Sequence, residues 1–167
     1  MKSMTITLVY LLSALQFIVS CGSQPEPETY LLPQDFTGKV NIIFNQANGE
    51  PVKYENGRRV YEIPANGILL TQFKDEDGII DHEYYYVDSA GNRTRLNVFS
   101  DDEKEKATNA GVFRDGTVGV YGNSSDPKSL SYQEFYIASG NEFEMYFTPQ
   151  YQKDFVDKVR LLTGYNF

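Results

Sequence analysis

Several residue types are absent or scarce in this chain. Its 167 residues include no tryptophan, one cysteine and one histidine. Because Cys21 has no second cysteine to pair with, an internal disulfide is excluded. Basic residues are also few, with 15 Lys+Arg against 23 Asp+Glu and a formal net charge of −8. Affinity for phosphate backbones rests on cations, so this balance argues against nucleic-acid binding.

The first 20 residues differ in character from everything that follows. Lys2 is their only charge, and residues 6–19 are mostly apolar. A short charged region followed by an apolar region of this size is typical of a secretory signal. The apolar segment is shorter than the roughly 20 residues that a membrane-spanning helix needs. It ends in Ile18-Val19-Ser20-Cys21, which resembles the lipobox of bacterial lipoproteins. The resemblance implies cleavage before Cys21 and a lipid on its thiol.

The signal defines the predicted domain organisation. We expect a signal peptide at 1–20, the lipidated Cys21 with a flexible spacer at 21–28, and one globular domain at 29–167. Residues 22–28 contain no apolar side chain that would pack, and their prolines and glutamates favour an extended, solvated backbone. Cleavage removes Lys2 and no acid, so 14 Lys+Arg remain against 23 Asp+Glu, a charge of −9. About 147 residues suffice for one core without disulfides or metal.

The composition and the turn signals predict a mainly β fold. Thirteen tyrosines and eleven phenylalanines occur together with many turn residues, a combination that favours strands. Residues 30–33 are predicted as a short edge strand ended by proline. Three dipeptides that favour hairpins follow within twenty residues, at Asn48-Gly49, Asn56-Gly57 and Asn66-Gly67. They indicate a β-meander or the edge of a β-sandwich.

Further strands are predicted in the second half of the chain, and one helix at its end. The strands fall at residues 81–87, 93–99, 111–114, 118–121 and 134–138. The charge run at 101–106 reads as a solvated loop or a helical turn. Thr148 and Pro149 form a typical helix start, and Gly164 a typical end. An apolar stripe between them predicts a helix packed on the sheet: Tyr151, Phe155, Val159 and Leu162.

Part of the chain resembles a bacterial family of small secreted or lipid-anchored proteins that share a domain of unknown function. The resemblance covers residues 29–98, with weaker similarity at 134–138. It is carried mainly by Tyr30-Leu31-Leu32-Pro33, Arg59-Val60-Tyr61-Glu62-Ile63-Pro64-Ala65-Asn66-Gly67-Ile68-Leu69 and Asp81-His82-Glu83-Tyr84-Tyr85-Tyr86-Val87-Asp88. The family has no established activity, so the resemblance identifies relatives and not chemistry. A looser likeness to prealbumin-like sandwiches concerns the fold alone.

The single histidine is the first candidate for catalysis. His82 stands between Asp81 and Glu83. Neighbouring side chains in a strand point to opposite faces, so these two acids do not converge with the histidine. We therefore interpret His82 as a solitary exposed histidine. The chain has no nucleophile elbow, zinc-protease helix or phosphate-binding loop, and no catalytic residue is predicted.

Acid-rich loops are the candidates for metal binding. Asp75-Glu76-Asp77-Gly78 has the composition of a calcium loop, but Ile79 and Ile80 interrupt the ligand spacing of an EF-hand. The acids at 101–105 show no cage spacing either. We predict no metal site and no cofactor.

Three consecutive tyrosines are the candidate for ligand binding. Alternation along a strand places Tyr84 and Tyr86 on one face and Tyr85 on the other. One face belongs to the core, and the other would offer an aromatic surface to a sugar or a peptide. Tyr84 and Tyr86 are named as the candidate ligand-binding residues.

The sequence thus predicts a lipid-anchored protein of the bacterial cell envelope, held outside the cytoplasm by lipid on Cys21. The preferred role is a non-enzymatic module that binds or scaffolds an envelope protein or glycan not specified by the sequence. One alternative is a hydrolase of envelope polymers, and the other is a carbohydrate-binding module using exposed tyrosines. A deep pocket where His82 meets a carboxylate and a hydroxyl would favour the hydrolase. A flat exposed tyrosine face would favour glycan binding.

Overall fold

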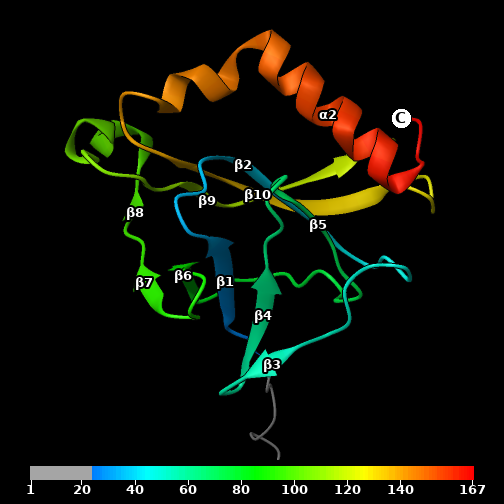
Figure 1. The fold of residues 1–167 in the computed structure, drawn as a ribbon. Coiled ribbons are helices and arrows are strands. Elements are labelled where there is room, and N and C mark those ends of the chain that lie inside the picture. The colour runs from blue at the N-terminus through cyan, green and yellow to red at the C-terminus, as the bar shows by residue number, and fades with distance from the viewer. Residues whose placement is uncertain (1–23) are drawn as a thin grey trace, which may run out of the picture.

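The computed structural model describes residues 24–167 (Figure 1). The predicted signal peptide, the lipidated Cys21 and the first part of the spacer lie outside the described residues. In residues 24–167, no helix is long and apolar enough to cross a membrane.

Two five-stranded mixed sheets pack against each other, and one C-terminal helix covers the outer face of the second sheet (Figure 1). This arrangement confirms the mainly β prediction. The first sheet has the order β3-β4-β1-β6-β7: β3 (Tyr54–Glu55), β4 (Arg58–Glu62), β1 (Glu28–Pro33), β6 (His82–Val87) and β7 (Arg93–Arg95). The second has the order β5-β2-β10-β9-β8: β5 (Ile68–Leu70), β2 (Gly38–Ile43), β10 (Leu130–Ala138), β9 (Gly111–Tyr121) and β8 (Val98–Phe99).

The connections are not those of a simple meander. Asn56-Gly57 joins the antiparallel strands β3 and β4, as the turn signal predicts. Asn66-Gly67 instead carries the chain into the second sheet, where β5 runs parallel to β2. The predicted strand at 93–99 is divided in the same way, because β7 lies in the first sheet and β8 in the second. Turn chemistry identified the turns, and tertiary pairing decided where each turn leads.

Strand β1 is central, and the prediction of an edge strand is wrong. It pairs in parallel with β4 on one side and with β6 on the other. Pro33 is its last residue, so the missing backbone N–H weakens only the end of the ladder. All residues of β1 before Pro33 are buried, and this strand brings its side chains to the centre of the molecule.

The spacer also ends earlier than predicted. Glu28 is already part of β1 and is buried, not solvated. Glu26 accepts hydrogen bonds from Arg59 Nε at 2.7 Å and from the Tyr54 hydroxyl at 2.8 Å. The predicted spacer contains no apolar side chain, but the carboxylates of Glu26 and Glu28 accept hydrogen bonds from buried or half-buried side chains of the domain.

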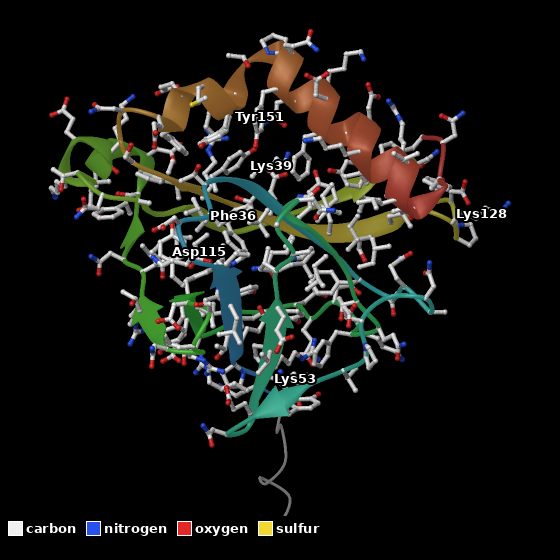
Figure 2. The ribbon with its side chains drawn as sticks, viewed as in Figure 1. Phe36, Lys39, Lys53, Asp115, Lys128 and Tyr151 are labelled. Carbon is white, nitrogen blue, oxygen red and sulfur yellow. The ribbon has the colours of Figure 1, made fainter. Side chains whose placement is uncertain are left out.

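Helix α2 (Pro149–Thr163) begins and ends where the sequence predicts. The Thr148 side chain accepts a hydrogen bond from the Tyr151 backbone N–H, and Gly164 closes the helix in a left-handed conformation. Phe155 and Val159 are buried against the second sheet. Figure 2 shows Tyr151 near Lys39, in the layer between the helix and β2. The charge run forms a 3-10 helix, η2 (Asp101–Lys106), which agrees with the predicted helical turn.

Candidate functional site

Three tyrosines from three neighbouring strands form a stack at the centre of the first sheet. The strand register places Tyr30 of β1 level with Tyr61 of β4 and Tyr84 of β6. The ring centroids lie 5.2 Å apart for Tyr30 and Tyr61 and 4.7 Å apart for Tyr30 and Tyr84, with both ring pairs nearly parallel. Phe135 of the second sheet contacts the stack edge-on. Aromatic pairs of these geometries hold the two sheets together.

The hydroxyl groups of this stack bind two carboxyl groups. Tyr30 and Tyr61 donate to Glu28, the latter over 3.0 Å, and Tyr84 donates to Asp115. Burial, reinforced by the nearby acids, raises the pKa of all three tyrosines above the ordinary value. The hydroxyls therefore remain protonated and act as fixed hydrogen-bond donors at neutral pH.

His82 lies between the same two acids. Its Nδ1 is 2.6 Å from Asp115 Oδ1, and its Nε2 is 3.2 Å from Glu28 Oε2. The Tyr84 hydroxyl is 3.4 Å from Nδ1. Only 9% of the His82 side chain is exposed. The interpretation of His82 as solitary and exposed is therefore wrong, because its partners come from β1 and β9 and not from Asp81 and Glu83.

A bulge in β9 brings Asp115 to this position. The register between β9 and β10 shifts where Arg114, Asp115 and Gly116 oppose a single residue of β10. Arg114 and Gly116 both adopt positive φ, at 54° and 72°. Bulges of this kind turn a side chain away from the regular alternation of the strand. The bulge thus contains the acid that faces Nδ1 of His82.

The pairing makes His82 strongly basic. Burial alone would lower the pKa of His82, but the bonds to Asp115 and Glu28 outweigh burial and raise it to about 9. For Asp115, burial acts to raise the pKa, and the bonds from His82 and Tyr84 reverse this and lower it. At neutral pH the imidazole is therefore protonated, and Asp115 is ionised. A protonated imidazole donates hydrogen bonds and is unavailable as a general base.

A cleft of about 460 Å³ opens beside the histidine. It is lined by the loop 75–80, by residues of β9 and β10 in the second sheet, and by Glu28 and His82 of the first sheet. Five acids and one base line it: Glu28, Asp75, Glu76, Asp77, Asp115 and His82. The remaining walls are largely apolar, with Phe44, Ile79, Ile80, Val118, Val120 and Tyr132 among them. The cleft therefore combines negative charge with apolar surface.

Two buried nitrogen atoms at the wall of this cleft have no hydrogen-bond partner. One is Nε2 of Gln133, a residue that is 3% exposed. The other is Nε2 of His82, which is near Glu28 but lacks hydrogen-bond alignment with it. A buried polar atom without a partner costs about 1–3 kcal/mol, so such atoms indicate a binding site when they line a cavity.

Another hollow of comparable size lacks these features. It measures about 400 Å³ and lies beside β5 and residues 48–53. Its wall contains Lys53 and Glu62, which pair with each other. No buried unpartnered side-chain atom of the described residues belongs to it. The cleft at His82 is therefore the better candidate.

The candidate tyrosines lie in the core. Tyr84 is 1% exposed and Tyr86 is 7% exposed. Tyr86 donates to the backbone carbonyl of Phe36 over 2.6 Å. The flat, exposed aromatic surface that a carbohydrate platform needs is not formed by these rings. Tyr84 contributes to the site through its hydroxyl alone.

Glu28, Asp115 and Gln133 are not among the predicted site residues. Glu28 belongs to the predicted spacer, and Asp115 and Gln133 lie outside the predicted strands. One signal was present for Asp115: the Asp115-Gly116 pair interrupts two apolar strand segments, as a bulge does. No local signal marks Gln133, because its burial depends on β10 lying between β2 and β9.

The acidic loops do not form a metal centre in the described part of the chain. No group of three or more His, Cys, Asp or Glu side chains between residues 24 and 167 has the arrangement to hold a metal ion. In the loop 75–80, Glu76 instead binds Arg59 Nη2 at 2.5 Å. In η2, Asp101 pairs with Arg114 and Glu103 with Lys106.

Comparison with known proteins agrees with this architecture. A protein-family model described as a family of unknown function (DUF6843) matches residues 24–145. A crystal structure entitled "Putative Lipoprotein from Bacillus anthracis" has a similar fold, with a TM-score of 0.57 and 16% sequence identity. The similarity covers 86% of this chain and 100% of the other. At this identity the likeness concerns the fold. No curated protein matches the chain significantly.

Proposed function

Since the chain belongs to the family of unknown function DUF6843, we propose its role from the site: a lipid-anchored, non-enzymatic protein of the cell envelope that binds a small ligand in the cleft beside His82. The observation that carries the proposal is the unpartnered buried Nε2 of Gln133, a residue that lines this cleft together with His82. The lipobox-like sequence ending at Cys21 supports the anchor.

The charges around the cleft specify the class of ligand. Five acids against one protonated histidine favour a cation. The unpartnered N–H group of Gln133 favours a ligand that also carries a hydrogen-bond acceptor. The apolar walls favour a short carbon skeleton. The expected ligand is therefore a small amine that also carries hydroxyl, carbonyl or carboxylate oxygen.

Ligand-detected NMR tests the proposed binding. Ethanolamine, glucosamine and a lysine-containing tripeptide serve as probes, each beside its N-acetylated counterpart that lacks the positive charge. Ser131 lines the cleft, so Ser131→Phe fills it, whereas Ser124→Phe adds the same ring at an exposed position of the β9–β10 connection. We expect an amine to bind the unsubstituted protein and Ser124→Phe but not Ser131→Phe. Equal binding of the acetylated compounds, or binding unchanged in Ser131→Phe, would refute the proposal.

The anchor is tested separately. The full precursor is expressed in a bacterial host with labelled palmitate, beside Cys21→Ala. We expect label and membrane retention in the unsubstituted chain and neither in the variant. An unlabelled, soluble product from the unsubstituted chain would remove the lipid anchor while leaving the ligand-binding proposal to its own test.

A hydrolase of envelope polymers is the second candidate. The observation in its favour is that His82 meets the Asp115 carboxylate and the Tyr84 hydroxyl beside a cleft. Against it, the raised pKa of His82 leaves the imidazole protonated at neutral pH and unavailable as a general base. Turnover of cell-wall fragments that disappears in Asp115→Asn would favour this candidate. We expect no turnover in either protein.

A further inference from the structure

The end of the domain where the described chain begins is held together by hydrogen bonds and an ion pair. We call it the tether end, and it comprises Pro25, Glu26, Tyr54, Arg59 and the loop 75–80. Arg59 donates to Glu26 over 2.7 Å, and the Glu26 backbone N–H donates to Glu76 over 2.8 Å. Pro25 packs against Gly78, where an added Cβ would lie 3.0 Å from the proline ring. The chain therefore leaves the domain at a fixed point beside the loop.

The tether end also carries exposed apolar surface. Ile79 follows the glycine that contacts Pro25, and its side chain is 99% exposed. The half-exposed Tyr54 ring holds Glu26 through its hydroxyl. Single exposed apolar residues are common on soluble proteins. Here the most exposed one stands beside the point from which the chain leads to the proposed anchor.

The length of chain before this point limits how far the domain can stand from a lipid anchor. Cys21 lies five positions before Glu26 in the sequence. Fully extended, this stretch reaches about 18 Å, at roughly 3.3–3.6 Å per residue. Because Glu26 is fixed to Arg59, this short length holds the tether end close to any bilayer that contains the lipid on Cys21.

From these observations we infer that the tether end rests on the bilayer surface, with Ile79 at the level of the lipid headgroups. The inference depends on the proposed lipid anchor. The tether end carries more acids than bases, with Glu26, Asp75, Glu76 and Asp77 against Arg59. The charge of the tether end therefore does not attract it to anionic lipids. We infer that it contacts an uncharged lipid surface, to which the anchor holds it close.

The orientation has a consequence for the cleft. The loop 75–80 is one wall of the cleft and part of the tether end. With Ile79 at the lipid surface, the ligand reaches His82 from the layer of water and headgroups next to the membrane. Amines displayed at the membrane surface are then the nearest candidates for the site.

The absence of tryptophan from the chain permits a direct test. Ile79→Trp places a single reporter in the loop. Leu161→Trp places the same reporter on α2, where Leu161 is 83% exposed and α2 lies across the molecule from β3 (Figure 1). Each lipidated mature protein is reconstituted into phosphatidylcholine vesicles whose acyl chains are brominated near the glycerol. We expect quenching of Ile79→Trp to exceed that of Leu161→Trp at least about twofold, because an aromatic ring at the interface is within reach of the bromines.

Controls separate the possible failures. The same tryptophan variants combined with Cys21→Ala should show no quenching. Hydrogen exchange on the unsubstituted lipidated protein should show slower exchange of the loop 75–80 in vesicles than in detergent. If the protein is lipidated and floats with the vesicles but the two tryptophans are quenched equally, the orientation is wrong and the anchor stands. A concentration-dependent blue shift of Ile79→Trp without vesicles would assign the surface to a second copy and overturn the inference. If Cys21 carries no lipid, both the proposed anchor and the inferred orientation are wrong.

Discussion

At the scale of single residues, His82 is defined by partners distant in sequence. Asp81 and Glu83 flank it, but both contact Arg58 instead. The two acids that raise its pKa belong to the start of β1 and to the bulge of β9. Pairing across strands thus keeps this histidine predominantly protonated at neutral pH.

The first prediction concerns the titration of His82. Because it is the only histidine, the NMR signal of its Hε1 proton needs no assignment among several histidines. We expect a midpoint of about 9. In Asp115→Asn the stronger partner loses its charge, and the midpoint should move down by about 1–2 units. A midpoint near the ordinary value in the unsubstituted protein would contradict the geometry described for this site.

The second prediction is the effect of that pKa on stability. The folded protein has a higher His82 pKa than the unfolded chain, whose value is about 6.5. The stabilisation is therefore fully present below about pH 6.5 and is lost as the pH rises through about 9. Allowing for solvent screening, we expect a loss of about 1–2 kcal/mol in the free energy of unfolding.

Urea unfolding across this pH range, beside His82→Gln, measures the effect. The difference in stability between the two proteins should shrink as the pH rises from 6.5 to 9. A difference that stays constant over the range would show that the histidine is not charged by its partners.

At the scale of the elements, the bulge in β9 decides whether the site exists. Gly116 has a φ of 72°. A Cβ added at this position would have only His82 Cε1 within 4 Å, at 3.9 Å. Gly116→Ala therefore costs backbone strain of about 1 kcal/mol and no steric clash. We expect the strained bulge to relax and draw Asp115 away, so the pKa of His82 should fall.

Gly91→Ala is the matched control for the bulge. Gly91 has φ of 84° with nothing within 4 Å, and it belongs to a turn outside the cleft. Its substitution should cost a similar stability, measured by urea unfolding, with the NMR midpoint of His82 unchanged. Equal midpoints in the two variants would mean that the bulge does not position Asp115.

Helix α2 depends on its N-cap in a way that a single substitution reveals. The Thr148 side chain accepts from the Tyr151 backbone N–H. Thr148→Ala removes this acceptor and should lower the free energy of unfolding by about 1 kcal/mol. Thr148→Ser keeps the hydroxyl and should cost much less. Thermal unfolding followed by circular dichroism compares them, and equal losses would argue against the cap.

At the scale of the whole molecule, Arg59 connects three parts of the chain. It binds Glu26 before β1, the Lys74 carbonyl and Glu76 in the loop, and it lies 4.8 Å above the Phe73 ring. Its side chain is buried. Removing the buried guanidinium leaves the groups that it binds without a hydrogen-bond donor. Arg59→Ala should therefore lower the free energy of unfolding by about 2–4 kcal/mol.

The same substitution should free the loop that walls the cleft. Hydrogen exchange of residues 74–80 should accelerate in Arg59→Ala more than exchange of β10 does. Arg95→Ala is the control, because Arg95 is exposed and is 3.8 Å from Glu83, a separation at which a surface pair contributes little. If hydrogen exchange accelerated equally in the loop and in β10 in both variants, Arg59 would not specifically stabilise the loop.

Sequence patterns were sufficient where the physical cause is local. The helix cap at Thr148, the left-handed Gly164 and the hairpin at Asn56-Gly57 each depend on a few neighbouring residues. The mainly β class follows from composition and alternation in the same way. The lipobox-like ending at Cys21 is also a local pattern, and it stays a prediction.

Tertiary structure alone decided the strand order and the candidate site. Whether β1 is central or at an edge depends on parallel pairing with β4 and β6, which are separated from it by long stretches of chain. The stack of Tyr30, Tyr61 and Tyr84 follows from that pairing. Glu28, His82 and Asp115 meet only because the two sheets pack face to face and a bulge turns one acid inward. Residue types and their spacing do not predict these contacts. Each contact depends on the free energy of the assembled core and not on the neighbouring residues in the chain.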